Sequence, residues 1–189
     1  MESAALHTRR LRLRRWIDSD RDVFAELNAD PDMMRYRFKP LTRGESDDLL
    51  NTVEACFDQH GFGQWAVERI QDHRVIGFIG LELAHNDVLF SPPVHIGWHL
   101  ARDMWGHGYA TEGATAALDH AFDVIRLPEV VSHTTSINAR SRAVMRRLGM
   151  RHNSTDDFDA PWYPVGHPHR RFVLYRITAA DWHARHQQS

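Results

Sequence analysis

Residues 97–112, GWHLARDMWGHGYATE, join an apolar strand to a helix through a short turn that contains two glycines. Gly106 and Gly108 have no Cβ, so the turn can adopt positive φ angles and let a ligand approach its backbone closely. The first amides of a helix have no intrahelical acceptors and carry a partial positive charge. This arrangement predicts a turn that binds an anion such as a phosphate group.

The helix after this turn is predicted from the spacing of its apolar residues. They recur at helical intervals and form one stripe for burial against a sheet, namely Ala110, Ala114, Ala117, Leu118, Ala121, Phe122 and Ile125. Two other phosphate-binding motifs do not fit. The dinucleotide fingerprint requires a third glycine where this chain has Thr111, and the Gly-Lys-Ser/Thr of the Walker motif is absent.

Four segments in a fixed order extend the pattern beyond the turn. They are VIGFIGLEL at residues 75–83, HIGWHL at 95–100, WGHGYATEG at 105–113 and NARSRAVMRRLGM at 138–150. With these segments the chain resembles the GNAT N-acetyltransferases over most of residues 9–177, and within them the branch that acetylates ribosomal-protein N-termini. The resemblance implies an enzyme that transfers an acetyl group from acetyl-CoA to a primary amine.

The resemblance also implies which residues contact acetyl-CoA. The turn is expected to bind the pyrophosphate, the backbone near Leu100 and Ala101 the thioester, and Asn138 the pantetheine. The full expected set is Leu100, Ala101, Trp105, Gly106, His107, Gly108, Tyr109, Ala110, Asn138 and Arg142. No metal is expected to take part.

Two residues depart from the family pattern. Relatives often have a glutamine or arginine three residues before the first glycine, where this chain has Asp103. A phosphate contact from that side chain is therefore not expected, although the backbone contact is. Many relatives also have a tyrosine general acid where this chain has Met145, although the ribosomal-protein branch commonly lacks it. Another group must then protonate the leaving thiolate.

Composition indicates one ordinary globular domain over residues 1–189. The chain is 42% hydrophobic and has a net charge of −2, so no overall field attracts nucleic acid or a membrane. No secretory or membrane-spanning apolar run occurs, and we expect a cytoplasmic protein. The single cysteine, Cys56, is expected to be a buried or half-buried thiol.

The order of elements predicts an α/β fold, a mixed central sheet of about six to seven strands with helices on both faces. Strands are predicted at residues 9–15, 62–70, 75–83, 94–100, 130–135 and 170–177, with a loop at 85–93. The first, RRLRLRR, is typical of an edge strand with one solvated face. Helices are predicted at residues 19–29, 42–59, 109–125 and 139–148 and after Thr178. Asp18 or Ser19 is the expected cap of the first helix, and Thr42 with Glu45 forms a capping box for the second.

Transfer to an amine requires a proton acceptor, because the amine is mostly protonated at neutral pH. In the strand at residues 94–100, alternation points the apolar residues Val94, Ile96 and Trp98 toward the core. It places His95, Gly97 and His99 on the opposite face. His95 stands where relatives often have glutamate, and imidazole exchanges protons near neutral pH. Glu82 is a competing base, and a water chain is a third alternative. The alternative for His95 is a surface histidine without a catalytic role, and the alternative for Glu82 is a solvated strand position.

Further candidates lie in the second half of the chain. Ser141 is a candidate hydrogen-bond donor to the CoA sulfur or an ordinary first-turn serine, while Arg142 and Arg147 either reach the 3′-phosphate of CoA or form a solvated helix face. The loop DDFDAPWYPVGHP at residues 156–168 combines three aspartates with Trp162 and Tyr163. It predicts a border of the acceptor channel that attracts a cationic amine, or else a surface loop packed on its own aromatic rings.

Two other functions stay open from the sequence alone. One is a non-catalytic acyl-CoA-binding module, because the tyrosine acid is missing. The other is a metal site built from histidine pairs, His95 with His99, His167 with His169, and His183 with His186. The acceptor is equally open between a protein N-terminus and a small-molecule amine. Because dimers are common among similar enzymes, a homodimer is the assembly that the resemblance implies.

Overall fold

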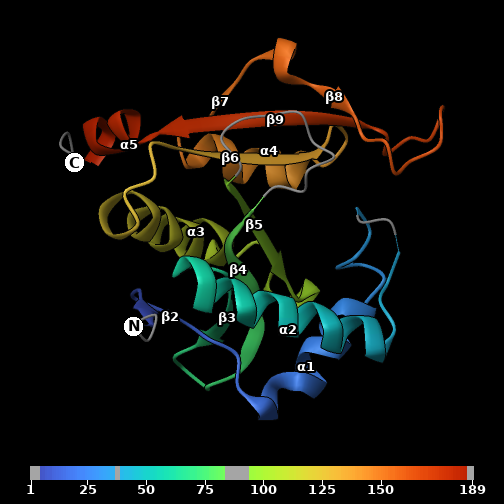
Figure 1. The fold of residues 1–189 in the computed structure, drawn as a ribbon, viewed down its shortest axis with the longest axis vertical. Helices are drawn as coiled ribbons and strands as arrows, with labels where there is room; N and C mark the ends of the chain where they lie inside the picture. The colour runs from blue at the N-terminus through green and yellow to red at the C-terminus, as the bar shows by residue number, and fades with distance from the viewer. Residues whose placement is uncertain (1–4, 37–38, 84–93, 187–189) are drawn as a thin grey trace. The chain divides into compact units, whose positions relative to one another are not determined.

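The structure is a computed structural model that describes residues 5–36, 39–83 and 94–186, and Figure 1 labels its helices and strands. The chain divides into two compact units. The first comprises residues 1–82 and 97–117, and the second comprises residues 83–96 and 118–189. The predicted loop at residues 85–93 lies outside the described residues.

The strands of the first unit pair in sequence order. β1 (Leu6–His7), β2 (Leu11–Arg14), β3 (Gln64–Arg69) and β4 (Val75–Leu83) are antiparallel neighbours, and the end of β5 (Val94–Leu100) follows. The predicted alternation in β2 is confirmed, because Leu11 and Leu13 are fully buried and Arg12 is exposed. The prediction of an edge strand is wrong, since β2 is paired with β1 on one side and β3 on the other.

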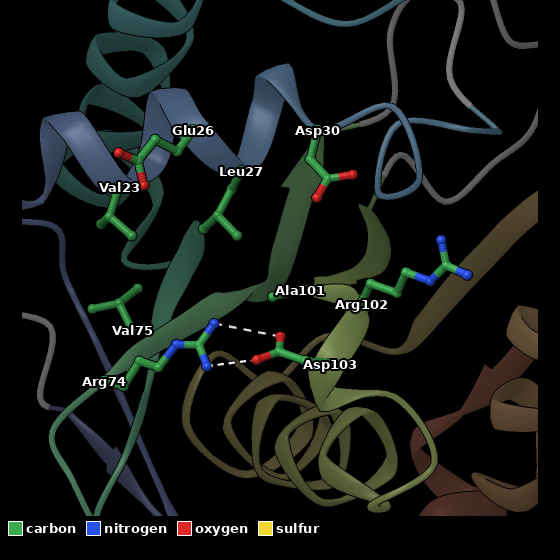
Figure 2. Close-up of a pocket in the computed structure, with 9 residues that line it drawn as sticks. All are labelled: Val23, Glu26, Leu27, Asp30, Arg74, Val75, Ala101, Arg102 and Asp103. Atoms are coloured by element: carbon green, nitrogen blue, oxygen red, sulfur yellow. Dashed lines mark hydrogen bonds and ion pairs between the residues drawn. The ribbon is translucent and has the colours of Figure 1, made fainter.

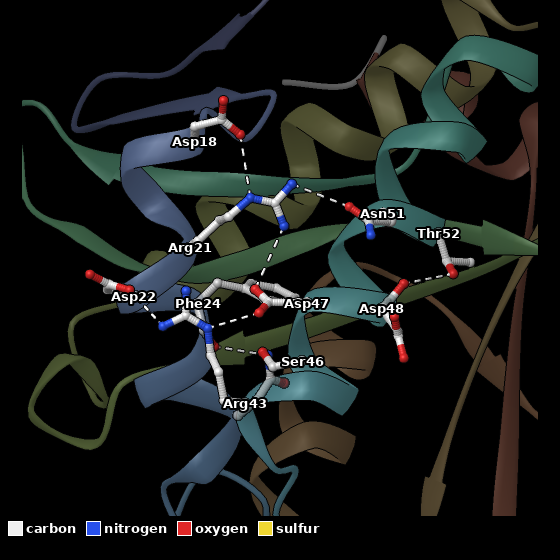
Figure 3. Close-up of polar contacts among 11 residues, drawn as sticks. Asp18, Arg21, Asp22, Phe24, Arg43, Ser46, Asp47, Asp48, Asn51 and Thr52 are labelled. Atoms are coloured by element: carbon white, nitrogen blue, oxygen red, sulfur yellow. Dashed lines mark hydrogen bonds and ion pairs between the residues drawn. The ribbon is translucent and has the colours of Figure 1, made fainter.

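Two helices of the first unit, α1 (Arg21–Ala29) and α2 (Arg43–His60), are joined by ion pairs. Arg21 contacts Asp18 and Asp47, and Arg43 contacts Asp22 and Asp47 (Figure 3). The capping box of α2 is confirmed: the Glu45 amide donates to Thr42 Oγ1 (3.3 Å), and the Thr42 amide donates to the Glu45 carboxylate (2.8 Å).

The predicted cap of the first helix is wrong. Residues Asp18–Asp20 form a 3₁₀ turn, η1, and α1 begins only at Arg21 without a side-chain cap. Asp20 is adjacent to the helix but is engaged elsewhere, because its carboxylate accepts hydrogen bonds from the Ile17 amide (3.0 Å) and from Arg14 (2.6 Å). A tertiary partner therefore replaces the local cap.

Helices cover both faces of the sheet in the first unit. On β4, the Phe78 ring packs against Phe24 of α1, with the ring centroids 5.5 Å apart. The next residue, Ile79, points to the opposite face. There its Cδ1 atom lies 2.6 Å from where a Cβ on Gly113 would be, so α3 (Tyr109–Asp119) approaches the sheet closely. Gly113 permits this approach because it has no side chain.

The second unit is built around β6 (Glu129–Thr135) and β9 (Arg171–Thr178), which are antiparallel along seven residue pairs. The start of β5 pairs in parallel with β6, with His95 opposite Val131. The two-residue strands β7 (Arg151–His152) and β8 (Phe158–Asp159) both pair with β9. A 3₁₀ turn, η4 (Ser154–Asp156), joins them.

The helices of the second unit largely match expectation. α4 (Ala139–Arg147) ends before Gly149, which has a positive φ of 81°, and α5 (Ala179–His186) begins after Thr178, whose hydroxyl accepts from the Asp181 amide (3.1 Å). The predicted long helix at 109–125 is altered at its end. Residues His120–Val124 form a π-helical turn, η3, that continues the chain after α3.

These elements form the predicted mixed α/β fold, with a parallel β5–β6 pair among antiparallel ones. The described residues contain nine strands, more than predicted, because β1, β7 and β8 are two-residue strands with weak sequence signals. Among the described helices, none has the length and apolar character that crossing a bilayer requires.

Candidate functional site

The glycine turn of the first unit has the backbone geometry of an anion site. Gly106 and Gly108 adopt φ angles of 82° and 83°, as their lack of a Cβ permits. The first helical hydrogen bond of α3 runs from the Glu112 amide to the Gly108 carbonyl (3.0 Å). The amides of residues 109–111 therefore have no acceptor within the helix and are available to a ligand.

Side chains beside the turn fix it to the end of β5. The Trp105 indole donates to the Leu100 carbonyl (2.7 Å), and the His107 ring stacks on Tyr109, with the centroids 5.7 Å apart. The Ala101 amide donates to the Ile76 carbonyl (2.8 Å) of β4. These contacts join the turn to the ends of β5 and β4. The assignment of residues 100–110 to acetyl-CoA stays a prediction.

Asp103 stands where relatives often have glutamine or arginine, and its negative charge is compensated by an ion pair within the first unit. Its carboxylate pairs with Arg74 (2.6 Å), and this hydrogen bond holds the pKa of Asp103 below its ordinary value. The neighbouring Arg102 pairs with Asp32. The departure from the family pattern is therefore accompanied by an ion pair that leaves no free carboxylate at this position.

A cavity of about 780 Å³ lies beside this ion pair, between α1 and the chain after β5 (Figure 2). It is lined by Val23, Glu26, Leu27, Asp30, Arg74, Val75, Ala101, Arg102 and Asp103. Of the predicted cofactor-binding residues only Ala101 lines it, and none of the candidate bases does. The cavity is therefore a feature separate from the residues predicted to carry the chemistry.

Glu82 lies near the end of β4 in the first unit. Its carboxylate accepts a hydrogen bond from the Gln64 side chain (2.5 Å), and it is only partly buried. Burial raises the pKa of the nearby Cys56 thiol, and the negative charge of Glu82 raises it further. Cys56 is half-buried, as predicted, and is therefore present as a neutral thiol.

His95 is buried in the second unit, where 7% of its surface is exposed. Its ring lies against the His133 ring of β6, with the centroids 4.3 Å apart, and His133 in turn contacts Phe158 and Phe172. The interpretation of His95 as a surface histidine is therefore wrong. The prediction that Trp98 is a core residue is also wrong, because Trp98 is only half-buried.

Asn138, Ser141 and Arg142 are brought together at the start of α4. Asn138 caps the helix by accepting from the Ser141 amide (3.2 Å), and its own amide group donates to Thr134 Oγ1 (3.0 Å). Arg142 donates through one terminal nitrogen to the Ser136 carbonyl (2.9 Å). Its buried Nε has no hydrogen-bond partner among the described residues.

The aspartates of the loop at residues 156–168 are all engaged within the second unit. Asp156 pairs with Arg176 (2.8 Å), Asp157 with His152 (2.8 Å), and Asp159 with Arg170 and Arg171 (both 3.4 Å). The aromatic part of the loop packs on itself, since Ala160 and Tyr163 form a buried cluster with Phe172. These contacts favour the alternative of a self-packed surface loop over that of an acceptor channel.

The predicted histidine pairs do not assemble into a metal centre within the described part of the chain. His167 and His169 have ring centroids 5.3 Å apart, and both contact Tyr163. His183 contacts Asp123 (2.8 Å). No group of three or more metal-ligating side chains occurs in the ranges 5–36, 39–83 and 94–186.

Comparison with known proteins places this geometry in a family. Residues 10–151 match the family described as Acetyltransferase (GNAT) domain. An Aspergillus fumigatus protein named FsC-acetyl coenzyme A-N(2)-transacetylase is 30% identical over 194 residues, which cover 94% of this chain and 77% of that protein. The chain belongs to the GNAT acetyltransferase family. It is an acyltransferase of the EC 2.3.1 class that uses acetyl-CoA, and the non-catalytic alternative is no longer needed.

Solved structures of GNAT enzymes have the same fold. The acetyltransferase from Agrobacterium tumefaciens is 27% identical, with a TM-score of 0.74 over 92% of this chain and 94% of its own. The spermidine N-acetyltransferase from Vibrio cholerae, solved with CoA and spermine, is 20% identical, with a TM-score of 0.73 over 91% of this chain and 97% of its own. The finer resemblance to the ribosomal-protein branch stays a prediction, since the match is to the acetyltransferase family as a whole.

Proposed function

We propose that this GNAT enzyme acetylates the primary amine of a small molecule. The observation that best supports binding of acetyl-CoA is the turn at residues 106–109. There two glycines with positive φ precede α3, and the first amides of the helix lack intrahelical acceptors. A Cβ on Gly106 would meet no protein atom within 4 Å, so the space beside this residue is open to a phosphate. The residues present therefore fit the pyrophosphate of acetyl-CoA.

Other residues are proposed to hold the rest of the donor. Asn138 is assigned to the pantetheine, and Arg142, with its unpartnered buried Nε, to the 3′-phosphate. Leu100 and Ala101 are assigned to the thioester end. Acetyl-CoA supplies the acetyl group as a thioester, whose C–S bond breaks as the C–N bond to the amine forms.

Two proton movements then need residues of this chain. His95 is the proposed base, which accepts the amine proton on a ring nitrogen, and its buried location keeps this step away from bulk water. The Ser141 hydroxyl is proposed to donate a hydrogen bond to the leaving sulfur. Glu82 is the alternative base, because its carboxylate is partly exposed and hydrogen-bonded to Gln64.

The choice of a small-molecule acceptor is supported by the name of the Aspergillus relative, which describes transfer from acetyl-CoA to an N(2) nitrogen. A protein N-terminus is the second candidate, supported by the sequence resemblance to the ribosomal-protein branch. The Vibrio enzyme named for spermidine is similar in fold, so a polyamine belongs in any test panel. An enzyme of either kind requires an amine that can lose a proton before it attacks.

The test is release of free CoA thiol from acetyl-CoA with three acceptor classes: peptides with a free N-terminus, polyamines, and small molecules that carry one primary amine. We expect turnover with small-molecule amines and little with peptides. Preferential turnover of peptides would overturn the small-molecule assignment. If none of the three classes of amine is acetylated and calorimetry detects no CoA binding, the proposed function itself is overturned.

A further inference from the structure

Three residues that lie far apart in the sequence meet at the first turn of α3. The Glu112 Oε1 atom accepts hydrogen bonds from Thr8 Oγ1 (2.6 Å) and from the Arg10 amide (2.9 Å). The Glu112 Oε2 atom contacts Arg10 Nε (2.7 Å) and Arg10 Nη2 (2.6 Å). We call this set, Thr8, Arg10 and Glu112, the Glu112 cluster. It attaches the start of α3 to the segment that leads into β2.

The charge of Glu112 matters because this residue lies in the first turn of α3, directly after the turn at residues 106–109 that is proposed to bind an anion. Its side chain is 18% exposed, and burial alone raises its pKa. The hydrogen bonds from Thr8 and Arg10 outweigh burial and hold the pKa below its ordinary value, so Glu112 is ionised at neutral pH. An uncompensated carboxylate here would repel a phosphate at the same helix end.

Arg10 supplies the compensating charge and also borders the turn. Its guanidinium carbon lies 4.6 Å from the centre of the Tyr109 ring, and its Nη2 lies 3.5 Å from where a Cβ on Gly108 would be. Its Nη1 has no protein partner in the described part of the chain, and 35% of its side chain is exposed. Position 103 cannot replace Arg10 as a source of positive charge, because this chain has an aspartate there, paired with Arg74.

We propose that Arg10 is a positioning residue for the binding of acetyl-CoA. Arg10 neutralises the charge of Glu112, so that the turn at residues 106–109 can bind the pyrophosphate. The inference rests on the proposed function of this turn. It assigns to the basic run at residues 9–15 a role that its composition, typical of a solvated strand face, does not reveal.

The test is calorimetric titration of CoA into four proteins. Arg10→Gln should bind CoA about tenfold more weakly than the wild type, because Glu112 is then uncompensated. The double variant Arg10→Gln/Glu112→Gln should recover to within about threefold of the wild type, because both charges are gone. Arg12→Gln is the matched control, which removes an exposed charge two residues further along the chain, in β2, and its affinity should be unchanged. In steady-state kinetics Arg10→Gln should raise KM for acetyl-CoA with little change in kcat.

A purely structural role for the Glu112 cluster gives a different pattern. The double variant would then bind as weakly as Arg10→Gln, since both lack the link between α3 and β2, and this result would overturn the inference.

Thermal melting checks that the variants are folded. If Arg10→Gln does not fold, Glu112→Gln decides the matter: it should bind CoA about two- to threefold more tightly, because it leaves Arg10 in excess, and weaker binding would overturn the inference. Wild-type protein that binds no CoA overturns the proposed function as well, whereas wild-type affinity in folded Arg10→Gln overturns this inference alone.

Discussion

Gly108 and Gly166 have nearly the same positive φ angle, 83° and 84°. Gly108 lies in the proposed anion turn, and Gly166 lies in an exposed turn of the second unit. Substitution by valine strains either position to the same degree, about 1–2 kcal/mol for a left-handed residue. The pair therefore separates the backbone cost from any effect on ligand binding.

We expect Gly108→Val to abolish CoA binding while the protein stays folded, because a Cβ hinders close approach of the phosphate and disfavours the positive φ. Gly166→Val should lose a similar amount of stability and keep its CoA affinity. Calorimetry for binding and urea denaturation for stability check both statements. Unchanged affinity in folded Gly108→Val would refute the assignment of the turn to the pyrophosphate.

A second residue-scale prediction concerns His95. If it accepts the amine proton, His95→Ala should lower kcat by about 10²- to 10⁴-fold at saturating acetyl-CoA. CoA affinity should barely change, because the proposed pyrophosphate contacts belong to residues 106–110. His95→Glu restores the residue that many relatives have at this position, so it should recover activity and shift the acidic limb of the rate profile to lower pH.

The comparison must use one amine for all variants, because the acceptor itself also ionises. Glu82→Gln is the matched test of the competing base and should keep most of its rate. If His95→Ala retains the wild-type rate and pH profile while Glu82→Gln has a lower rate and an altered pH profile, the base is Glu82. Loss in neither variant would favour a water chain.

At the scale of elements, α2 shows how a local signal determines a boundary. The capping box of Thr42 and Glu45 satisfies two donors at the helix start that otherwise lack acceptors. We expect Thr42→Ala to destabilise the protein by about 1 kcal/mol. Thr52→Ala is the control in the same helix, because the Thr52 hydroxyl is exposed and only donates to the Asp48 carbonyl (3.0 Å). Equal losses in the two variants, measured by urea denaturation, would show that the cap is not the cause.

Elements with local signals were therefore predictable from the sequence. β4 and β5 have the bounds expected from the sequence, residues 75–83 and 94–100. The start of α1 was not predictable, since the expected caps Asp18 and Ser19 lie in a 3₁₀ turn. Asp20, directly before the helix, binds Arg14 of β2, a partner that only the tertiary structure provides. For the loop at residues 156–168 the sequence left two alternatives open. The contacts that favour a self-packed loop are tertiary, because Asp156 and Asp159 bind arginines of β9 and of the residue before it.

At the scale of the whole molecule, acid stability depends on carboxylates with lowered pKa values. Glu68 is the most buried example: burial raises its pKa, but hydrogen bonds from Arg14 (2.6 Å) and His73 (3.1 Å) lower it below the ordinary 4.5. Its folded pKa is below its unfolded pKa, so its stabilisation is complete above about pH 4.5 and is lost as the pH falls through the folded value.

We therefore expect the free energy of unfolding to fall as the pH drops from about 5 toward 2, and Glu68→Gln to show a flatter acid limb. At neutral pH the variant should be less stable by about 2 kcal/mol, the typical loss for a hydrogen bond to a charged group. Glu45→Gln is the exposed control, whose effect on the acid limb should shrink at high salt. Urea denaturation across the pH range measures both variants. An acid limb of wild-type slope in Glu68→Gln would contradict the assignment.

The candidate site was predictable only where it is contiguous in the sequence. The strand, turn and helix of residues 94–119 carry local signals that the structure reproduces. The Glu112 cluster has no such signal, because Thr8 and Arg10 precede Glu112 by more than a hundred positions. His133 was likewise missed as the neighbour of His95, since a strand pairing alone brings the two rings together.

The separation within the Glu112 cluster also has a consequence for folding time. The turn and helix are local and can form within microseconds. Their partner Arg10 is 102 positions away, so the cluster forms only after a long loop has closed at a considerable entropic cost. In a refolding experiment, helical circular dichroism should therefore return before the capacity to bind CoA. Ligand capture would mark one of the last steps by which this chain reaches its native state.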